Sequence, residues 1–160
     1  MKPFIMLIGN SHSGKSTIIS SLTGYKYKRL RHFVEDKSTG QKISVIINSP
    51  QESVVNVARF KELLQNTFDQ ADYIGLVIAI QPNFPTKRLS LEEIIFIAND
   101  TGDWEFNAFI LNPPYNGDQF DSTEIETRLE FVDVNYHTLN AQQFAFLNAE
   151  QIKNITNIYD

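Results

Sequence analysis

Positions 9–16 read Gly-Asn-Ser-His-Ser-Gly-Lys-Ser, and they join an apolar run at 3–8 to a helix-forming segment at 15–22. The apolar run has the length of a buried strand, and the Thr23-Gly24 pair is a typical helix end. A glycine-rich loop between a strand and a helix is typical of a βα unit, in which the helix returns the chain to begin a parallel strand. The start of the chain therefore predicts an α/β fold with a parallel sheet.

The remaining segments continue this alternation of strands and helices. Turn-forming residues at 35–40 separate strand-like segments at 29–34 and 41–48, which predicts a hairpin. Further strands are expected at 73–80, 106–111 and 132–137, and helices at 50–68, 90–98, 122–131 and 140–158. This order predicts one domain over residues 1–160, with a mostly parallel sheet, helices on both faces and ligands at the carboxyl ends of the strands.

Capping residues mark where these later helices begin. The signals are Ser49 with Glu52, Ser90 with Glu93, Asp121 or Ser122, and Asn140 with Gln143. Within the helix at 50–68, one stripe at helical spacing is expected to face the core, and it consists of Val57, the stem of Lys61, Leu64 and Phe68.

The composition agrees with a folded domain and excludes several kinds of site. Of the 160 residues, 42% are hydrophobic and 12% aromatic, which is too apolar for a disordered chain and suits a single core. The absence of cysteine excludes a disulfide scaffold, an iron–sulfur cluster, a thiolate zinc site and a cysteine nucleophile. The three histidines, His12, His32 and His137, have no ligand spacing, so any metal is expected to be bound by oxygen.

The net charge of −5 is unevenly distributed along the chain. Residues 1–80 hold ten Lys and Arg against six Asp and Glu, whereas residues 81–160 hold four against thirteen. A polyanion would therefore prefer the first half, although the overall charge argues against a general nucleic-acid binder. No apolar run reaches the length of a membrane span, and the start at 1–8 is too short for a signal peptide, so a cytoplasmic protein is expected.

The motif at 9–16 matches the pattern G-x-x-x-x-G-K-[ST] at every fixed position, and the sequence here resembles the P-loop NTPase superfamily. With glycine near 7%, such a match arises by chance on the order of once in ten thousand starts. The resemblance implies that backbone N–H groups wrap the phosphates, Lys15 reaches the outer phosphates, Ser16 binds Mg²⁺ and Thr17 reaches the inner phosphate. The nucleotide-contacting residues it implies are Gly9, Asn10, Ser11, His12, Ser13, Gly14, Lys15, Ser16 and Thr17.

The order of elements is similar to that of the Ras-like GTPases over most of the chain, with departures in the secondary motifs. Where that family has Asp-x-x-Gly after the hairpin, this chain has Ile47 or Asn48 and then Pro50. Asp72 precedes its strand, so its carboxylate is expected at the end of the sheet opposite the ligand. Where the family has the guanine-reading Asn-Lys-x-Asp, this chain reads Asn-Pro-Pro-Tyr at 112–115. Guanine specificity is thus not indicated, so ATP is the default expectation and GTP the alternative.

Candidates for the remaining catalytic roles follow the hairpin. By resemblance, Gln51 would orient the attacking water and Glu52 would act as a base or as an outer-sphere metal ligand. The same residues are equally explained as a helix-capping box. Asp36 and Thr39 in the hairpin turn are weaker candidates.

A basic run follows the first helix and is interleaved with tyrosines. Its cations could contact the nucleotide, an acidic partner or nucleic acid, or could simply blunt an edge strand. They are Lys26, Lys28, Arg29 and Arg31. Lys87 and Arg88, after the strand at 73–80, are expected at the ligand side of the sheet.

These observations predict a P-loop protein that binds a nucleoside triphosphate with Mg²⁺, a slow NTPase or nucleotide switch acting on a partner. Hydrolysis would proceed by in-line attack of water on the γ-phosphate, with Lys15, Mg²⁺ and the loop amides stabilising the charge. A small-molecule kinase is one alternative, although the five arginines form no late cluster for a lid. A non-catalytic nucleotide-binding adaptor is the other.

Overall fold

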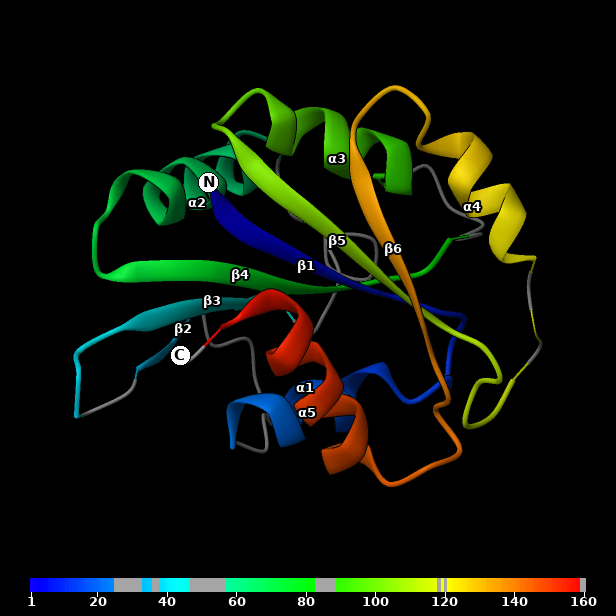
Figure 1. Cartoon of the computed structure of the whole chain (residues 1–160). Helices are drawn as coiled ribbons and strands as arrows, with labels where there is room; N and C mark the ends of the chain where they lie inside the picture. The colour runs from blue at the N-terminus through cyan, green and yellow to red at the C-terminus, as the bar shows by residue number, and fades with distance from the viewer. Residues whose placement is uncertain are drawn as a thin grey trace.

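A single sheet organises the molecule, shown here as a computed structural model that describes residues 1–24, 33–35, 38–46, 57–82, 89–117, 119 and 121–158. Six strands lie in the order β2-β3-β4-β1-β5-β6, and every neighbouring pair is parallel except the antiparallel pair β2–β3 (Figure 1). The strands are β1 (Lys2–Ile8), β2 (Phe33–Glu35), β3 (Lys42–Ile46), β4 (Tyr73–Ile80), β5 (Trp104–Leu111) and β6 (Val134–Leu139). The predicted α/β fold, mostly parallel sheet and hairpin are confirmed.

Helices cover both faces of this sheet, as predicted. They are α1 (Lys15–Thr23), α2 (Val57–Asp69), α3 (Leu91–Asn99), α4 (Ser122–Arg128) and α5 (Ala145–Thr156). Figure 1 shows α2, α3 and α4 on one face and α1 and α5 on the other. The described helices include none long and apolar enough to cross a lipid bilayer.

The central strand β1 explains why its sequence is apolar without alternation. Phe4, Met6 and Ile8 pack into the core beneath α2, α3 and α4, whereas Ile5 and Leu7 pack beneath α1 and α5. All five side chains are fully buried. A strand covered on both faces needs hydrophobic residues at every position, and β1 therefore anchors the loop that follows it.

The buried face of α2 differs from the predicted stripe. Phe60, Leu64 and Thr67 are buried, while Val57 is 48% exposed and Lys61 forms an exposed ion pair with Asp100. The predicted stripe is confirmed at Leu64, which is buried, and at Phe68, which packs against the core, but it does not include polar Thr67. Its hydroxyl is satisfied there by Ser44 Oγ at 2.6 Å and by the Leu63 carbonyl at 2.9 Å, which allows burial. The expected start of this helix near Ser49 lies outside the described residues.

The later helix boundaries confirm two capping predictions and correct a third, and one helix ends earlier than predicted. Ser90 and Glu93 form the predicted capping box at α3, with Ser90 Oγ accepting from the Glu93 N–H at 3.2 Å. Asp121 caps α4, but this helix ends at Arg128 instead of continuing to 131.

The last helix begins at Ala145, five residues later than predicted, so the expected capping box of Asn140 and Gln143 is wrong. Asn140 Oδ1 instead accepts from the Gln142 N–H within a turn, at 2.9 Å. Gln143 Nε2 donates to Asn148 Oδ1 at 2.6 Å, and Asn148 Nδ2 donates to the Asn140 carbonyl at 3.0 Å. These side chains therefore tie the β6–α5 loop to the buried side of the helix.

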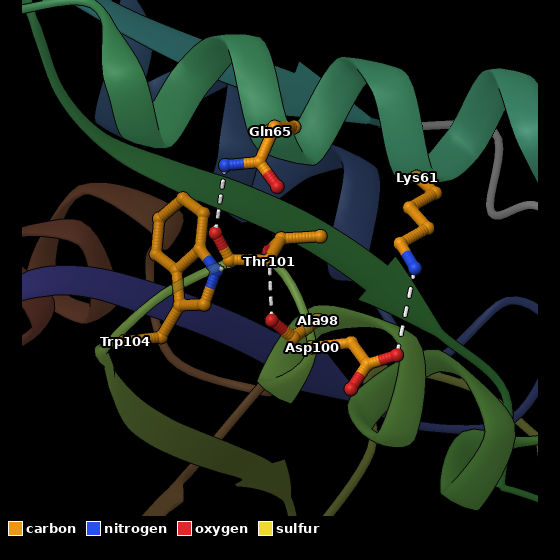
Figure 2. A network of polar contacts seen from close by, with 6 residues as sticks. All are labelled: Lys61, Gln65, Ala98, Asp100, Thr101 and Trp104. Carbon is orange, nitrogen blue, oxygen red and sulfur yellow. Dashed lines mark hydrogen bonds and ion pairs between the residues drawn. The ribbon is translucent and has the colours of Figure 1, made fainter.

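A polar network joins α2 to the turn between α3 and β5 (Figure 2). Gln65 Nε2 donates to the Thr101 carbonyl at 2.9 Å, and Trp104 Nε1 donates to Thr101 Oγ1 at 2.9 Å. The Thr101 hydroxyl in turn donates to the Ala98 carbonyl at 2.7 Å. The network lies at the amino edge of the sheet, which we define as the edge where the parallel strands begin. It holds β5 in place from the end opposite the loop at 9–14.

Candidate functional site

The loop at 9–14 lies where the connections of the sheet diverge. Strand β1 lies between β4 and β5. The segment after β1 leads to α1 on one face of the sheet, whereas the segments after β4 and β5 lead to α3 and α4 on the other face. In open α/β sheets this divergence opens a crevice at the carboxyl ends of the strands, where ligands bind. The loop joins the end of β1 to the start of α1 and therefore occupies this position.

Two glycines allow the loop to adopt its conformation. Gly14 has φ +104°, a value that L side chains rarely adopt, and it is the N-cap of α1. A side chain at Gly9 would collide with Ser13 Oγ, which folds back over it. The Gly9 N–H donates to the Ile80 carbonyl at 3.1 Å, which fixes the loop to the end of β4. The loop geometry thus explains why glycine occupies both fixed positions of the motif.

Lys15 lies across the inside of the loop. Its side chain is only 9% exposed, and its ammonium donates to the carbonyl oxygens of Gly9 at 2.7 Å and Asn10 at 2.8 Å. Ser13 Oγ lies 3.4 Å from the same nitrogen. The positive charge is therefore held at the loop by backbone acceptors, and an incoming anion could compete with those carbonyls for it.

The segment after β5 pairs two further carbonyls of the loop. The Tyr115 N–H donates to the Ser13 carbonyl at 2.9 Å, and the Asn116 N–H donates to the His12 carbonyl at 3.1 Å. The N-cap Gly14 offers no side-chain acceptor to the first turn of α1. The N–H groups of a first helical turn point beyond the helix N-terminus and carry its partial positive charge. Carbonyl dipoles are thus paired within the protein, while the N-terminal end of α1 is suited to bind an anion.

A cavity of about 390 Å³ lies over this loop. Residues 11–17 line it together with Gln81, Tyr115 and Asn116, and none of these side chains is a carboxylate. Lys15 contributes a formal positive charge and Ser16 and Thr17 contribute exposed hydroxyls. The described lining therefore favours a negatively charged, oxygen-rich ligand.

The structure brings the motif residues together and leaves other predicted candidates apart from them. Gly9 and Asn10 supply carbonyls to Lys15, and the remaining motif residues line the cavity. The hairpin turn, with Thr39, lies at the amino edge, because β3 begins there beside Tyr73, so Thr39 is not part of this site. The candidates that lie outside the described residues are Gln51, Glu52, Asp36, Lys26, Lys28, Arg29, Arg31, Lys87 and Arg88.

Asp72 lies at the amino edge, as predicted from its position before β4. Its carboxylate pairs with the Lys42 ammonium at 2.9 Å. This hydrogen bond lowers the pKa of Asp72 and raises the pKa of Lys42. The pair is therefore explained by strand pairing at the far end of the sheet, and Asp72 is not available to the loop.

Three lining residues were missed by the motif, namely Gln81, Tyr115 and Asn116. Gln81 directly follows β4, and the other two follow β5, so each lies just beyond the carboxyl end of a strand next to β1. The sequence feature that could have indicated these residues is their position directly after apolar runs. This feature does not identify them by itself, because the order of strands in the sheet depends on non-local pairing. Strand β4 lies between β3 and β1, and Gln81 is therefore next to the loop.

The described residues are suited to bind Mg²⁺ only together with a phosphate ligand that supplies further oxygens. Among the residues that the structure describes, no cluster of three His, Asp or Glu side chains could hold a metal by itself. Mg²⁺ commonly keeps several waters and binds through substrate phosphates, with few protein ligands. The exposed hydroxyl of Ser16, next to Lys15, is suited to be one such ligand.

Comparison with known proteins does not assign the chain to a family. No family model matches the sequence, and no curated protein matches it.

Proposed function

We propose that this protein binds the polyphosphate chain of a nucleoside triphosphate at the loop formed by residues 9–17. The observation that carries the proposal is the buried Lys15 ammonium on the Gly9 and Asn10 carbonyls, beside a helix N-terminus without a side-chain cap. A polyphosphate offers many charged oxygens to such a cluster of donors. The absence of carboxylates from the described lining avoids repulsion of that charge.

On this proposal, the motif residues divide the polyphosphate between them. Terminal phosphate oxygens would take the place of the loop carbonyls at Lys15 Nζ, and Thr17 would reach the inner phosphate. Ser16 would hold Mg²⁺ together with the phosphates, and the metal would supply charge neutralisation when bound. His12, Gln81 and Asn116 line the same cavity and would contact the outer part of the polyphosphate.

Hydrolysis, on the same proposal, is slow. Water would attack the γ-phosphorus, the bond to the β-phosphate oxygen would break, and inorganic phosphate, the diphosphate and a proton would leave. The described lining offers amides, such as Gln81, to orient that water but no carboxylate to accept its proton. A protein that turns over slowly persists in its triphosphate-bound form, which suits a nucleotide-dependent switch or adaptor for a partner.

Isothermal titration calorimetry tests the proposal with ATP, GTP and inorganic tripolyphosphate, each with Mg²⁺, on wild type and Lys15→Ala. A charge-assisted hydrogen bond contributes about 1.5–3 kcal/mol, so the variant is expected to bind at least about tenfold more weakly. Phosphate release in the same samples measures hydrolysis. Lys61→Ala is the matched control, because Lys61 is exposed and pairs with Asp100 far from the loop.

The result depends on Lys15→Ala being folded, since Lys15 bonds to the loop carbonyls. Ser16→Ala, which removes an exposed hydroxyl, provides a second variant and is expected to weaken binding only when Mg²⁺ is present. Wild type that binds none of the three compounds, or equal binding by wild type and a folded Lys15→Ala, would refute the proposed function.

A further inference from the structure

A second cavity, of about 640 Å³, adjoins the phosphate cavity. Gly14, Thr17 and Tyr115 line both cavities, so the two share a wall at the start of α1. The rest of the second cavity comes from Ile18 and from the connection between β6 and α5, residues 141–145. This space is therefore continuous with the loop but is built from different elements.

The chemistry of the second cavity is different from that of the first. Its side chains are largely apolar, and they include two aromatic rings from separate connections, Tyr115 after β5 and Phe144 before α5. Both rings are exposed, Tyr115 at 65% and Phe144 at 74%. Exposed aromatic rings on a cavity wall offer surfaces on which a flat ligand can stack.

Phe144 occupies a position that its own helix does not favour. It is the N-cap of α5, where Ser, Thr, Asp or Asn would bond the free N–H groups, and it makes no side-chain cap bond. Its ring stacks on Phe146, with centroids 5.9 Å apart and an interplanar angle of 19°, instead of entering the core. Helix stability therefore does not explain this phenylalanine, whereas a stacking ligand would.

The polar groups on this wall are carboxamides. Gln143 uses its Nε2 on Asn148, which leaves its Oε1 as an acceptor, and Gln142 is exposed, with its Nε2 3.4 Å from the Pro114 carbonyl. No described residue that lines the cavity is a carboxylate. A carboxamide pairs with an adenine edge, because both present one donor beside one acceptor. Guanine presents N1–H and N2–H₂ donors together, and leaving them without an acceptor is costly.

We infer that the second cavity holds an adenine base, stacked on Tyr115 and Phe144, with Gln142 at its polar edge. The inference rests on the proposed function, since the base would be joined through its ribose to the phosphates on the loop. It makes the protein selective for adenine nucleotides, and it assigns that selectivity to the connections after β5 and β6.

Calorimetry with ATP, GTP and inorganic tripolyphosphate separates the base from the phosphates. Wild type is expected to bind ATP about tenfold or more tightly than tripolyphosphate, because stacking of a base contributes a gain of that order. Phe144→Ala is expected to lose most of this advantage while binding tripolyphosphate as wild type does. Phe96→Ala is the matched control, because Phe96 is a 66% exposed phenylalanine on α3, on the other face of the sheet.

Gln142→Glu tests the polar edge directly. A carboxylate at this position would accept from the guanine donors, so the ratio of ATP to GTP affinity is expected to fall, with tripolyphosphate affinity reduced only through the added charge. Failure of wild type to bind tripolyphosphate and both nucleotides would count against the proposed function itself. Tripolyphosphate binding without tighter ATP binding, a preference for GTP, or an unchanged ATP advantage in Phe144→Ala would overturn the adenine site alone.

Discussion

The two edges of the sheet use polar groups in different ways. At the amino edge, side chains bond to segments distant in sequence: Lys2 Nζ donates to the Thr67 carbonyl at 3.0 Å and to the Gln70 carbonyl at 2.7 Å. The network of Figure 2 and the Lys42–Asp72 pair lie at the same edge. At the carboxyl edge, the Tyr115 and Asn116 N–H groups bond the loop carbonyls, and Ser16, Thr17 and Gln81 line a cavity.

This difference separates what stabilises the fold from what is suited to bind a ligand. Polar side chains at the amino edge form hydrogen bonds and ion pairs within the protein, so changing them should alter the free energy of unfolding. The carboxyl edge places hydroxyls, amides and aromatic rings beside open space. In parallel sheets with helical connections, ligands bind at this edge because the connections diverge there. Substitutions at the two edges should therefore have separable effects on stability and on binding.

The largest effect is expected from Trp104→Ala at the amino edge. Trp104 is 4% exposed and packs edge-on against Phe4 and Phe68, with ring centroids 5.4 and 5.2 Å away. Removing so large a buried side chain costs about 3–5 kcal/mol of unfolding free energy. Urea denaturation followed by far-ultraviolet circular dichroism measures this loss.

Trp104→Phe is the matched variant, because it retains much of the packing and loses the indole bond to Thr101. It should cost less than Trp104→Ala. Tripolyphosphate affinity of the folded fraction should be unchanged in both variants, and a loss of affinity that exceeds the loss of folded protein would show that the edges are coupled.

A smaller effect on stability, with a large effect on binding, is expected from Gly14→Ala at the carboxyl edge. At φ +104° a side chain is strained by about 1–3 kcal/mol, and its Cβ would lie 3.2 Å from Tyr115 Cβ. The strain is expected to shift residues 14–17. Tripolyphosphate affinity should then fall by about tenfold or more, because the loss of one charge-assisted hydrogen bond to the phosphates is enough to cause a decrease of that size. Calorimetry and thermal unfolding measure the two effects.

Gly24→Ala provides the comparison for this variant. Gly24 has φ +75° at the other end of α1, and nothing lies within 4 Å of an added Cβ. It should lose stability through the same backbone strain and retain wild-type affinity. Equal losses of affinity in the two glycine variants would mean that helix stability, and not loop geometry, governs binding.

Sequence patterns predict the parts of this structure that depend on local information. The apolar run at 73–80 predicts β4 at its observed bounds, and the glycine motif predicts a loop in which Gly14 has a positive φ and an added side chain at Gly9 would meet Ser13 Oγ. Patterns could not show that β4 lies between β3 and β1, because pairing between strands is non-local. The sequence alone therefore does not indicate that Gln81 lies beside the loop. Thr67 is buried because the distant Ser44 bonds its hydroxyl, and Asn148 is buried because the preceding loop satisfies its carboxamide; no hydrophobic pattern reveals such partners.

The smallest effect is expected from Asp72→Asn, which tests whether titration at the amino edge influences the carboxyl edge. The Lys42 bond lowers the pKa of Asp72, so the stabilisation it provides is present above the unfolded pKa near 3.8 and is lost as pH falls through the lower folded pKa. The raised pKa of Lys42 maintains the pair up to and beyond pH 10.5. The variant should therefore be slightly less stable than wild type at pH 7, and the difference should shrink at pH 3.

Salt provides an independent check on this pair. Both side chains are partly exposed, so 1 M NaCl should screen most of the difference in unfolding free energy between Asp72→Asn and wild type. The Lys42 N–H still donates to the carbonyl of residue 72 at 2.7 Å, which keeps the strand register independent of the carboxylate. ATP affinity at pH 7 should then be the same in both proteins. If it falls in the variant, the charge at the amino edge acts on the loop through the length of β4, and the separation between a stabilising edge and a binding edge does not hold.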